Sequence, residues 1–250
     1  MALSIASRFL SAHDPSAFAR RALDFHPDPA QQQILASGHP RRILCCSRQW
    51  GKSTVAAILA VHQLVFGPPG NLTLVLAPSL RQSAELVRKM NAFLRRLRIH
   101  PRGDGENHPS ILMPNGSRVV GLPGRSPHTR GFSSVGLLII DEAARVSDLA
   151  YFALRPVLAV STGSILAMST PAGEQGFFYK AWKDETTWQR YTVTADQCPR
   201  ISPSFLDEER RLMADWWFRQ EYECQFVPVS EGIFPRRKLR NFFVDDTRPL

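Results

Sequence analysis

The sequence predicts an α/β protein in which helices flank a mainly parallel β-sheet. Strand-like and helix-like stretches alternate along its 250 residues, a pattern typical of this architecture. Residues 137–140 are four consecutive aliphatic residues, as expected for a strand buried on both faces of a parallel sheet. Residues 45–54 join a strand-like segment to a helix-like one through a short loop that ends in Gly51-Lys52-Ser53.

The first predicted elements surround this loop. A strand over 42–47 enters it and a helix over 53–66 leaves it, and the Gly-Pro-Pro-Gly turn at 67–70 ends that helix. A strand over 72–77 then precedes a helix over 80–97, in which large apolar side chains recur at helical spacing.

The second half of the chain continues the alternation. Asn115-Gly116 predicts a hairpin between strands over 111–114 and 118–122. The remaining predicted elements are strands over 136–140, 163–168 and 188–194, a short helix over 177–182 and a long helix over 205–226. Residues 199–203 are a candidate boundary between the core and a C-terminal appendage.

The chemistry of the loop suits phosphate binding. Backbone N–H groups in a loop that opens a helix converge on phosphate oxygens, and the helix N-terminus adds the positive end of its dipole. Lys52 can reach the β- and γ-phosphates of a nucleotide, and Ser53 can ligate Mg²⁺. Cys46 stands where the signature G-x-x-x-x-G-K-[ST] has its first glycine, so a second motif is needed downstream.

That second motif is the acidic pair Asp141-Glu142, which follows the aliphatic strand. The carboxyl end of a strand is where open α/β sheets bind ligands. Successive side chains of a strand point in opposite directions, so one acid can hold Mg²⁺ while the other polarises the attacking water. The alternative is that the pair only caps the next helix. Together with the loop, the pair favours an ATPase.

The charge balance favours a polyanionic partner. The chain carries 31 basic and 22 acidic residues, a net charge of +9, and its pI is about 9.9. Nucleic acid is the leading partner for such a chain; the alternative is a basic surface that only keeps the protein soluble. No apolar run approaches the ~20 residues that cross a bilayer, so no membrane association is expected.

Two other features are weak signals. The four cysteines show no C-x-x-C spacing, which favours buried reduced thiols over a zinc site or a disulfide framework. The first 25 residues are rich in Ala, Ser and Arg, as in an organelle transit peptide. Asp14 and Asp24 argue against that interpretation and favour an ordinary N-terminal helical segment.

In combination, these motifs resemble the ATPase domain of the large terminase subunit, the motor that packages DNA in tailed phages. The resemblance runs from about residue 25 to about residue 234. Residues 47–54 resemble the family's phosphate loop, in which the first glycine is commonly absent, and residues 138–143 resemble its second nucleotide motif. The resemblance implies the additional-strand type of P-loop fold, with a small helical lid or linker subdomain. The nucleotide-binding residues that it implies are Gln31, Ser47, Arg48, Gln49, Trp50, Gly51, Lys52, Ser53 and Thr54.

The resemblance also assigns roles. Lys52 and Glu142 are catalytic, Ser53 and Asp141 hold Mg²⁺, and Ser169-Thr170 is the coupling motif that links hydrolysis to movement. Residues 28–35 resemble the adenine-reading segment, with Gln31 toward the base edge. Ala30 stands where the family often has an aromatic residue, which makes stacking on adenine doubtful at that position.

The domain boundaries follow from the same resemblance. Residues 1–198 are expected to form the ATPase core with the N-terminal adenine-reading segment, and residues 199–250 a C-terminal helical lid or linker. Full-length members continue into a nuclease domain. The sequence has no strand-borne acidic cluster beyond residue 234, so we expect the nuclease domain to be absent and these residues to have no nuclease activity.

Phosphoryl transfer also calls for an arginine that offsets charge in the transition state. Arg48 can act in cis from the loop, and Arg130 can act in trans across a ring interface. We favour Arg130; for each arginine the alternative is a surface ion pair or a contact with a DNA phosphate.

The expected function is ATP hydrolysis that drives translocation of double-stranded viral DNA into procapsids. The expected partners are DNA, portal protein, the small terminase subunit and further copies in a ring, in the cytoplasm of the bacterial host; in solution the chain can be a monomer. Arg81, Arg88, Lys89 and Arg125 are candidate DNA contacts. Two alternatives stay open: a helicase-type DNA-dependent ATPase, and a non-hydrolysing, nucleotide-dependent assembly protein.

Overall fold

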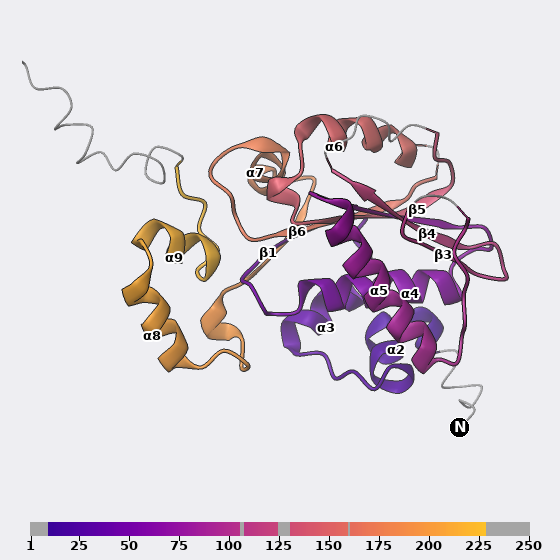
Figure 1. The fold of residues 1–250 in the computed structure, drawn as a ribbon, viewed down its shortest axis with the longest axis horizontal. Coiled ribbons are helices and arrows are strands. Elements are labelled where there is room, and N and C mark those ends of the chain that lie inside the picture. Colours follow the sequence, from indigo (N-terminus) through magenta and orange to yellow (C-terminus); the bar gives the residue numbers. More distant parts are fainter. Residues whose placement is uncertain (1–9, 106–107, 125–130, 160, 229–250) are drawn as a thin grey trace, which may run out of the picture.

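A computed structural model describes residues 10–105, 108–124, 131–159 and 161–228 of the chain (Figure 1). Its centre is a seven-stranded sheet in the order β3-β4-β2-β5-β6-β1-β7. The strands are β1 (Arg41–Cys46), β2 (Leu72–Ala77), β3 (Ser110–Leu112), β4 (Arg118–Pro123), β5 (Val135–Asp141), β6 (Ser164–Ser169) and β7 (Gln189–Val193).

The sheet is parallel except for β3, which pairs with β4 in the predicted hairpin, with Ile111 opposite Val119. In the middle of the sheet, β6 pairs with β1 on one side and with β5 on the other. The strand that enters the loop and the strand that ends in the acidic pair are therefore separated by one strand. This is the additional-strand arrangement that was predicted, and it brings the carboxyl ends of β1, β5 and β6 to one edge of the sheet.

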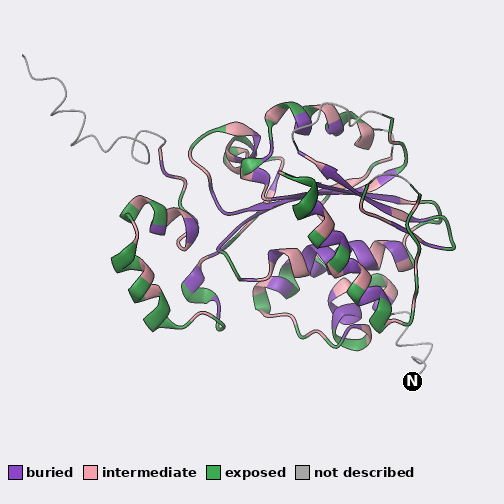
Figure 2. Ribbon diagram, viewed as in Figure 1, coloured by how far each residue is buried: buried purple, intermediate pink, exposed green. Residues whose placement is uncertain are grey.

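Helices cover both faces of the sheet (Figure 1). One face carries α2 (Pro15–Ala22), α3 (Pro29–Ala36), α4 (Lys52–Phe66) and α5 (Leu80–Arg96); the other carries α6 (Asp148–Leu154) and α7 (Gly176–Lys183). Strand residues alternate between the two cores: Leu44 and Ile139 pack toward the first group of helices, whereas Ile43 and Ile140 pack toward the second. Figure 2 shows that the sheet and α4 are largely buried. All four cysteines are buried free thiols, as predicted.

Short 3₁₀ segments lie in the connections between these elements: η1 (Ala143–Arg145), η2 (Arg155–Leu158) and η3 (Ala195–Gln197). Among the described residues, no helix combines the length and apolar character that a bilayer span requires.

The prediction of one long helix over 205–226 is wrong. The chain forms two helices, α8 (Pro203–Leu212) and α9 (Asp215–Glu221), because Met213 and Ala214 adopt extended backbone. The break folds α9 back onto α8: the guanidinium of Arg210 lies 4.1 Å from the ring centroid of Phe218, and the Tyr222 hydroxyl donates to Glu209 at 2.8 Å.

The aromatic run at the start of α9 is only partly buried. Phe218 is buried, but Trp217 is 49% exposed. No residue of α8 is buried, so this helix pair extends from the core with little apolar packing of its own (Figure 2).

Candidate functional site

The loop between β1 and α4 is shaped by two residues with left-handed backbone. Gln49 has φ 63° and Gly51 has φ 110°. A Cβ atom on Gly51 would lie 3.0 Å from Nε2 of Gln31 and 3.5 Å from a guanidinium nitrogen of Arg200, so both the backbone angle and the close approach require glycine.

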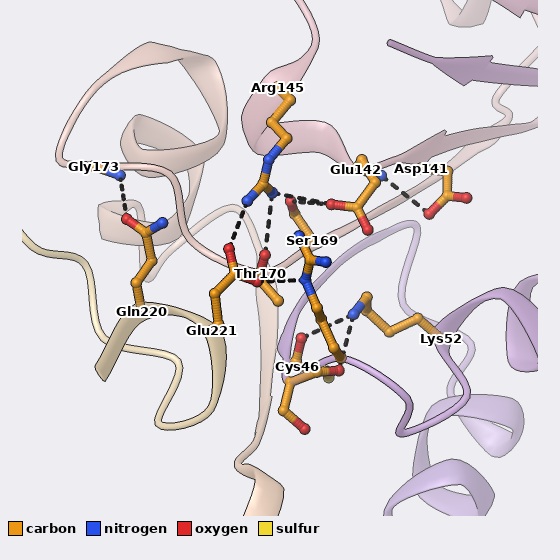
Figure 3. Close-up of polar contacts among 12 residues, drawn as sticks. Cys46, Lys52, Asp141, Glu142, Arg145, Ser169, Thr170, Gly173, Gln220 and Glu221 are labelled. Carbon is orange, nitrogen blue, oxygen red and sulfur yellow. Dashed lines mark hydrogen bonds and ion pairs between the residues drawn. The ribbon is translucent and has the colours of Figure 1, made fainter. Parts of the chain in front are cut away.

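Lys52 begins α4 and turns its ammonium group into the loop. Its Nζ donates to the carbonyl oxygens of Cys46 at 3.0 Å and Ser47 at 2.9 Å, and the residue is buried (Figure 3). These carbonyls satisfy hydrogen bonds of the ammonium group, and Lys52 also lines the pocket described below.

The hydroxyl side chains that follow Lys52 stand at the start of α4. Ser53 and Thr54 are partly exposed. Nζ of Lys89, on the neighbouring helix α5, donates to Oγ1 of Thr54 at 3.3 Å. Burial lowers the pKa of this lysine, and the carboxylate of Asp141 opposes that shift. Lys89, considered from the sequence only as a DNA contact, therefore belongs to the wall of the site.

The acidic pair lies at the end of β5, and its two members differ in environment. Asp141 is buried; burial and the neighbouring Glu142 raise its pKa to about 6, against the opposing effect of Lys52 and Lys89. Glu142 has left-handed backbone (φ 48°) and stands just before η1. The carboxylate of Glu142 accepts from Arg145 at 3.0 Å and from the Ser169 hydroxyl at 3.5 Å.

An open pocket of about 520 Å³ lies over the loop. Of the predicted site residues it is lined by Gln31, Arg48, Gln49, Gly51, Lys52, Ser53, Thr54 and Glu142. Ser47 and Trp50 are loop residues that are fully buried, and Asp141 is buried at the end of β5. Arg130 lies outside the described residues.

Gln31 lines the pocket, and protein groups bind its side chain. Its Oε1 accepts from the backbone N–H of Asp28 at 3.1 Å, and its Nε2 donates to the carbonyl of Trp50 at 3.2 Å. The guanidinium of Arg200 donates to the same carbonyl. Gln31 thus braces the loop from α3. Phe25, which the sequence analysis did not assign, also lines the pocket and supplies an aromatic ring.

The predicted coupling motif, Ser169-Thr170, is connected to the acidic pair through Arg145. Ser169 and Thr170 are buried at the end of β6. One guanidinium nitrogen of Arg145 donates to Glu142 at 3.0 Å and to the Thr170 hydroxyl at 3.1 Å, while the other donates to Glu221 at 2.9 Å (Figure 3). Glu221 also accepts from Nε of Arg48 at 2.7 Å.

Sequence reasoning missed Arg145, Arg200 and the role of Glu221. Arg145 carried a usable signal, because it stands three residues after Glu142 in the segment that leaves the strand. Arg200 carried none, since it reaches the site from 150 residues away along the chain. For Glu221 the sequence offered only the likeness of residues 218–222 to a segment that is typical of the family.

The donors that could hold a metal ion fit Mg²⁺. Mg²⁺ is typically bound by one or two carboxylates together with substrate phosphates and water, and not by a cage made only of protein groups. The buried carboxylate of Asp141 and the hydroxyl of Ser53 match that description. Within the described residues there is no cluster of three or more His, Cys, Asp or Glu side chains that would form a protein-only metal site.

Comparison with known proteins identifies the family. The family model "Terminase large subunit, T4likevirus-type, N-terminal" matches residues 43–241. The terminase large subunit of Thermus phage G20c is 26% identical over 274 residues, covering 91% of this chain and 56% of the relative. That of Escherichia phage T5 is 28% identical over 220 residues, covering 81% and 50%. The chain thus spans about half the length of the curated relatives it matches.

Solved structures show the same fold. The ATPase domain of the Thermus phage P74-26 large terminase, in a mutant form, superposes with a TM-score of 0.73 at 24% identity, covering 86% of this chain and 100% of that one. The large terminase of a second thermophilic bacteriophage, in complex with ADP, gives a TM-score of 0.67 at 13% identity, covering 80% and 54%. By the match of its sequence to the family model, the chain belongs to the family of phage terminase large subunits and corresponds to their N-terminal part.

Proposed function

We propose that this chain binds ATP with Mg²⁺ and hydrolyses it, as the motor domain of a terminase large subunit that drives double-stranded DNA into procapsids. The observation that carries the proposal is the pocket at the carboxyl edge of the sheet. Lys52, Ser53 and Glu142 line this one pocket, although the loop and the acidic pair are about 90 residues apart in the sequence.

Each side chain then has a role. Lys52 moves its ammonium hydrogen bonds from the Cys46 and Ser47 carbonyls toward the β- and γ-phosphates, while the N-terminus of α4 faces the phosphate charge. Ser53 and Asp141 would hold Mg²⁺, which neutralises charge on the phosphate oxygens when it is bound.

Glu142 orients and deprotonates the attacking water. Its contact with the Ser169 hydroxyl supports a link between hydrolysis and the coupling motif. We assign charge stabilisation in the transition state to Arg130 supplied by a neighbouring copy, with Arg48 in cis as the second candidate. For the base we assign the aromatic contact to Phe25, because Ala30 cannot stack.

The wider organisation is proposed on the same basis. Residues 1–198 form the ATPase core and residues 199–250 the lid or linker; the helix pair α8–α9 extends from the edge of the core (Figure 1). The net charge of +9 supports duplex DNA as partner. A ring of copies acting with portal protein and the small terminase subunit in the host cytoplasm completes the proposal, and we propose no DNA cleavage by these residues.

The test is ATP turnover with and without duplex DNA, compared with a Glu142→Ala variant. Loss of the general base should lower kcat by about 10² or more while nucleotide binding, measured by calorimetry, is retained. The matched control is Glu185→Ala, which removes an exposed carboxylate that pairs with Arg190 away from the pocket.

Three results would contradict the proposal in different ways. If the native chain binds ATP without turnover, the non-hydrolysing assembly protein is favoured. Unwinding of a forked duplex would favour the helicase-type ATPase. Failure to bind ATP at all would refute the proposal and both of these alternatives.

A further inference from the structure

Helix α9 reaches the site through two consecutive side chains. Oε1 of Gln220 accepts from the backbone N–H of Gly173, just beyond β6, at 3.1 Å. The carboxylate of Glu221 accepts from Nε of Arg48 at 2.7 Å and from Arg145 at 2.9 Å. Figure 3 shows Gln220 and Glu221 side by side, with Arg145 between Glu221 and Glu142. One helix end thus contacts the loop, the segment after the acidic pair and the segment after β6.

Glu221 is buried, and the two arginines are not. The exposed fraction of its side chain is 5%, against 61% for Arg48 and 31% for Arg145. A buried carboxylate needs charged or hydrogen-bonding partners, and here both oxygens have a guanidinium. The arginines can move toward solvent or a ligand, whereas the carboxylate between them is fixed in place.

The contacts of Arg145 show what this carboxylate controls. Its guanidinium is divided between Glu142 at 3.0 Å, Thr170 at 3.1 Å and Glu221 at 2.9 Å. If the charge of Glu221 is removed, Glu142 becomes the carboxylate partner of Arg145 in this network. A tighter ion pair holds the carboxylate of Glu142 on Arg145 and away from a water molecule.

The contact of Arg48 has a separate consequence. Arg48 lines the nucleotide pocket while its Nε is held by Glu221. A terminal phosphate that seeks this guanidinium must compete with Glu221 for it. Nucleotide that carries a γ-phosphate is therefore expected to loosen the contact between the loop and α9.

From this geometry we propose that Glu221 is a positioning residue of the site. Its carboxylate fixes the positions of the Arg48 and Arg145 guanidinium groups. When a bound nucleotide displaces these groups, Glu221 transmits the displacement to α9. This inference rests on the proposed ATPase function and deepens it by naming the residue that connects the site to the C-terminal helices.

The test compares Glu221→Gln with Glu223→Gln. Glutamine keeps the size of the side chain and removes its charge. Glu223 is the matched control, because it pairs with Arg210 of α8 and does not line the nucleotide pocket. The measurements are kcat for ATP, the dissociation constants of ADP and ATPγS by competition with a fluorescent nucleotide in the presence of Mg²⁺, and Tm.

For Glu221→Gln we expect kcat to fall about tenfold, because Arg145 then pairs with Glu142. The ratio of the ADP to the ATPγS dissociation constant should rise by about threefold or more, since Arg48 is free to meet the terminal phosphate. Glu223→Gln should change neither quantity. A structural role alone would lower Tm and weaken both nucleotides equally, and that result would overturn the proposal, as would values within twofold of the native chain.

A second variant covers the case in which Glu221→Gln does not fold. Glu221→Asp keeps the charge but is one methylene shorter, so it cannot reach both arginines, and it should show the same changes in kcat and in the affinity ratio. Native values, or failure of this variant to fold as well, would overturn the proposal. If the native chain binds both nucleotides without turnover, hydrolysis is refuted while the affinity ratio still tests Glu221; if it binds neither, both proposals fail.

Discussion

The chemistry of Asp141 works against the stability of the fold. Its carboxylate is buried at the end of β5, and burial and the nearby Glu142 raise its pKa from the usual 3.8 to about 6. The folded chain therefore binds this proton more tightly than the unfolded chain does. It follows that the protein loses stability as the pH rises from about 4 to about 6, and above pH 6 the ionised group is retained at a cost.

Replacing Asp141 with asparagine should consequently stabilise the fold while abolishing Mg²⁺-dependent ATP turnover. At pH 7.5 we expect Asp141→Asn to gain about 1–2 kcal/mol, or about 3–6 °C in Tm for a chain of this size, and to lose Mg²⁺-dependent ATP turnover. The gain should disappear below about pH 4, where the native carboxyl group is protonated in both states. Thermal unfolding measured between about pH 4 and pH 7.5 checks this gain. The control is Asp196→Asn, which replaces an exposed carboxylate. If Asp141→Asn is less stable than the native chain at pH 7.5, the argument is wrong.

Other site residues show where prediction from sequence ends. That Gly51, Lys52, Ser53 and Glu142 meet at one pocket could be predicted, because both motifs follow strands of a parallel sheet and the carboxyl ends of such strands share one edge. The sequence did not show that Gln31 and Arg200 both bind the carbonyl of Trp50 and brace the loop. That contact depends on how α3 and the segment before α8 pack, and no local pattern encodes it.

Among the elements, those with a strong apolar pattern were predicted well. β1, α4 and β5 carry nearly continuous buried residues, and the hairpin of β3 and β4 has a specific turn signal at Asn115-Gly116. The division into α8 and α9 was missed, because Met213-Ala214 contains neither glycine nor proline. The break is stabilised by tertiary contacts such as Arg210 with Phe218 and Glu209 with Tyr222.

The break can be tested with proline. Ala214 has φ −62° and Met213 before it is extended, which are the backbone angles that proline and its preceding residue prefer. Ala214→Pro should therefore leave Tm unchanged or raise the free energy of unfolding by about 0.4–1 kcal/mol. The control, Glu208→Pro in the interior of α8, should cost about 3 kcal/mol or more of helix stability. A loss for Ala214→Pro as large as that of the control would mean that α8 and α9 are one continuous helix.

At the scale of the whole molecule, the topology assembles the site and the charge distribution suggests where DNA is held. The sequence predicted the parallel sheet and both motifs. The order of the strands, which places β6 and the predicted coupling motif between β1 and β5, was indicated by the family resemblance and not by any pattern in the strands themselves.

Exposed arginines recur along α5, including Arg81, Arg88 and Arg95, on the side of this helix opposite its buried residues.

If the exposed arginines of α5 bind DNA phosphates, the affinity for random-sequence duplex DNA should depend steeply on salt concentration. Each arginine that neutralises a phosphate contributes about 0.9 to the slope of log K against log salt concentration, so Arg81→Gln with Arg95→Gln should reduce that slope by about 2 and weaken all sequences alike. The control replaces two exposed arginines elsewhere, Arg155 and Arg190, with glutamine, which changes net charge equally. Fluorescence anisotropy between about 50 and 200 mM salt measures the two salt slopes, because phosphate contacts weaken strongly over this roughly fourfold range. Equal slopes for the two double variants would show that net charge, and not the face of α5, attracts the DNA.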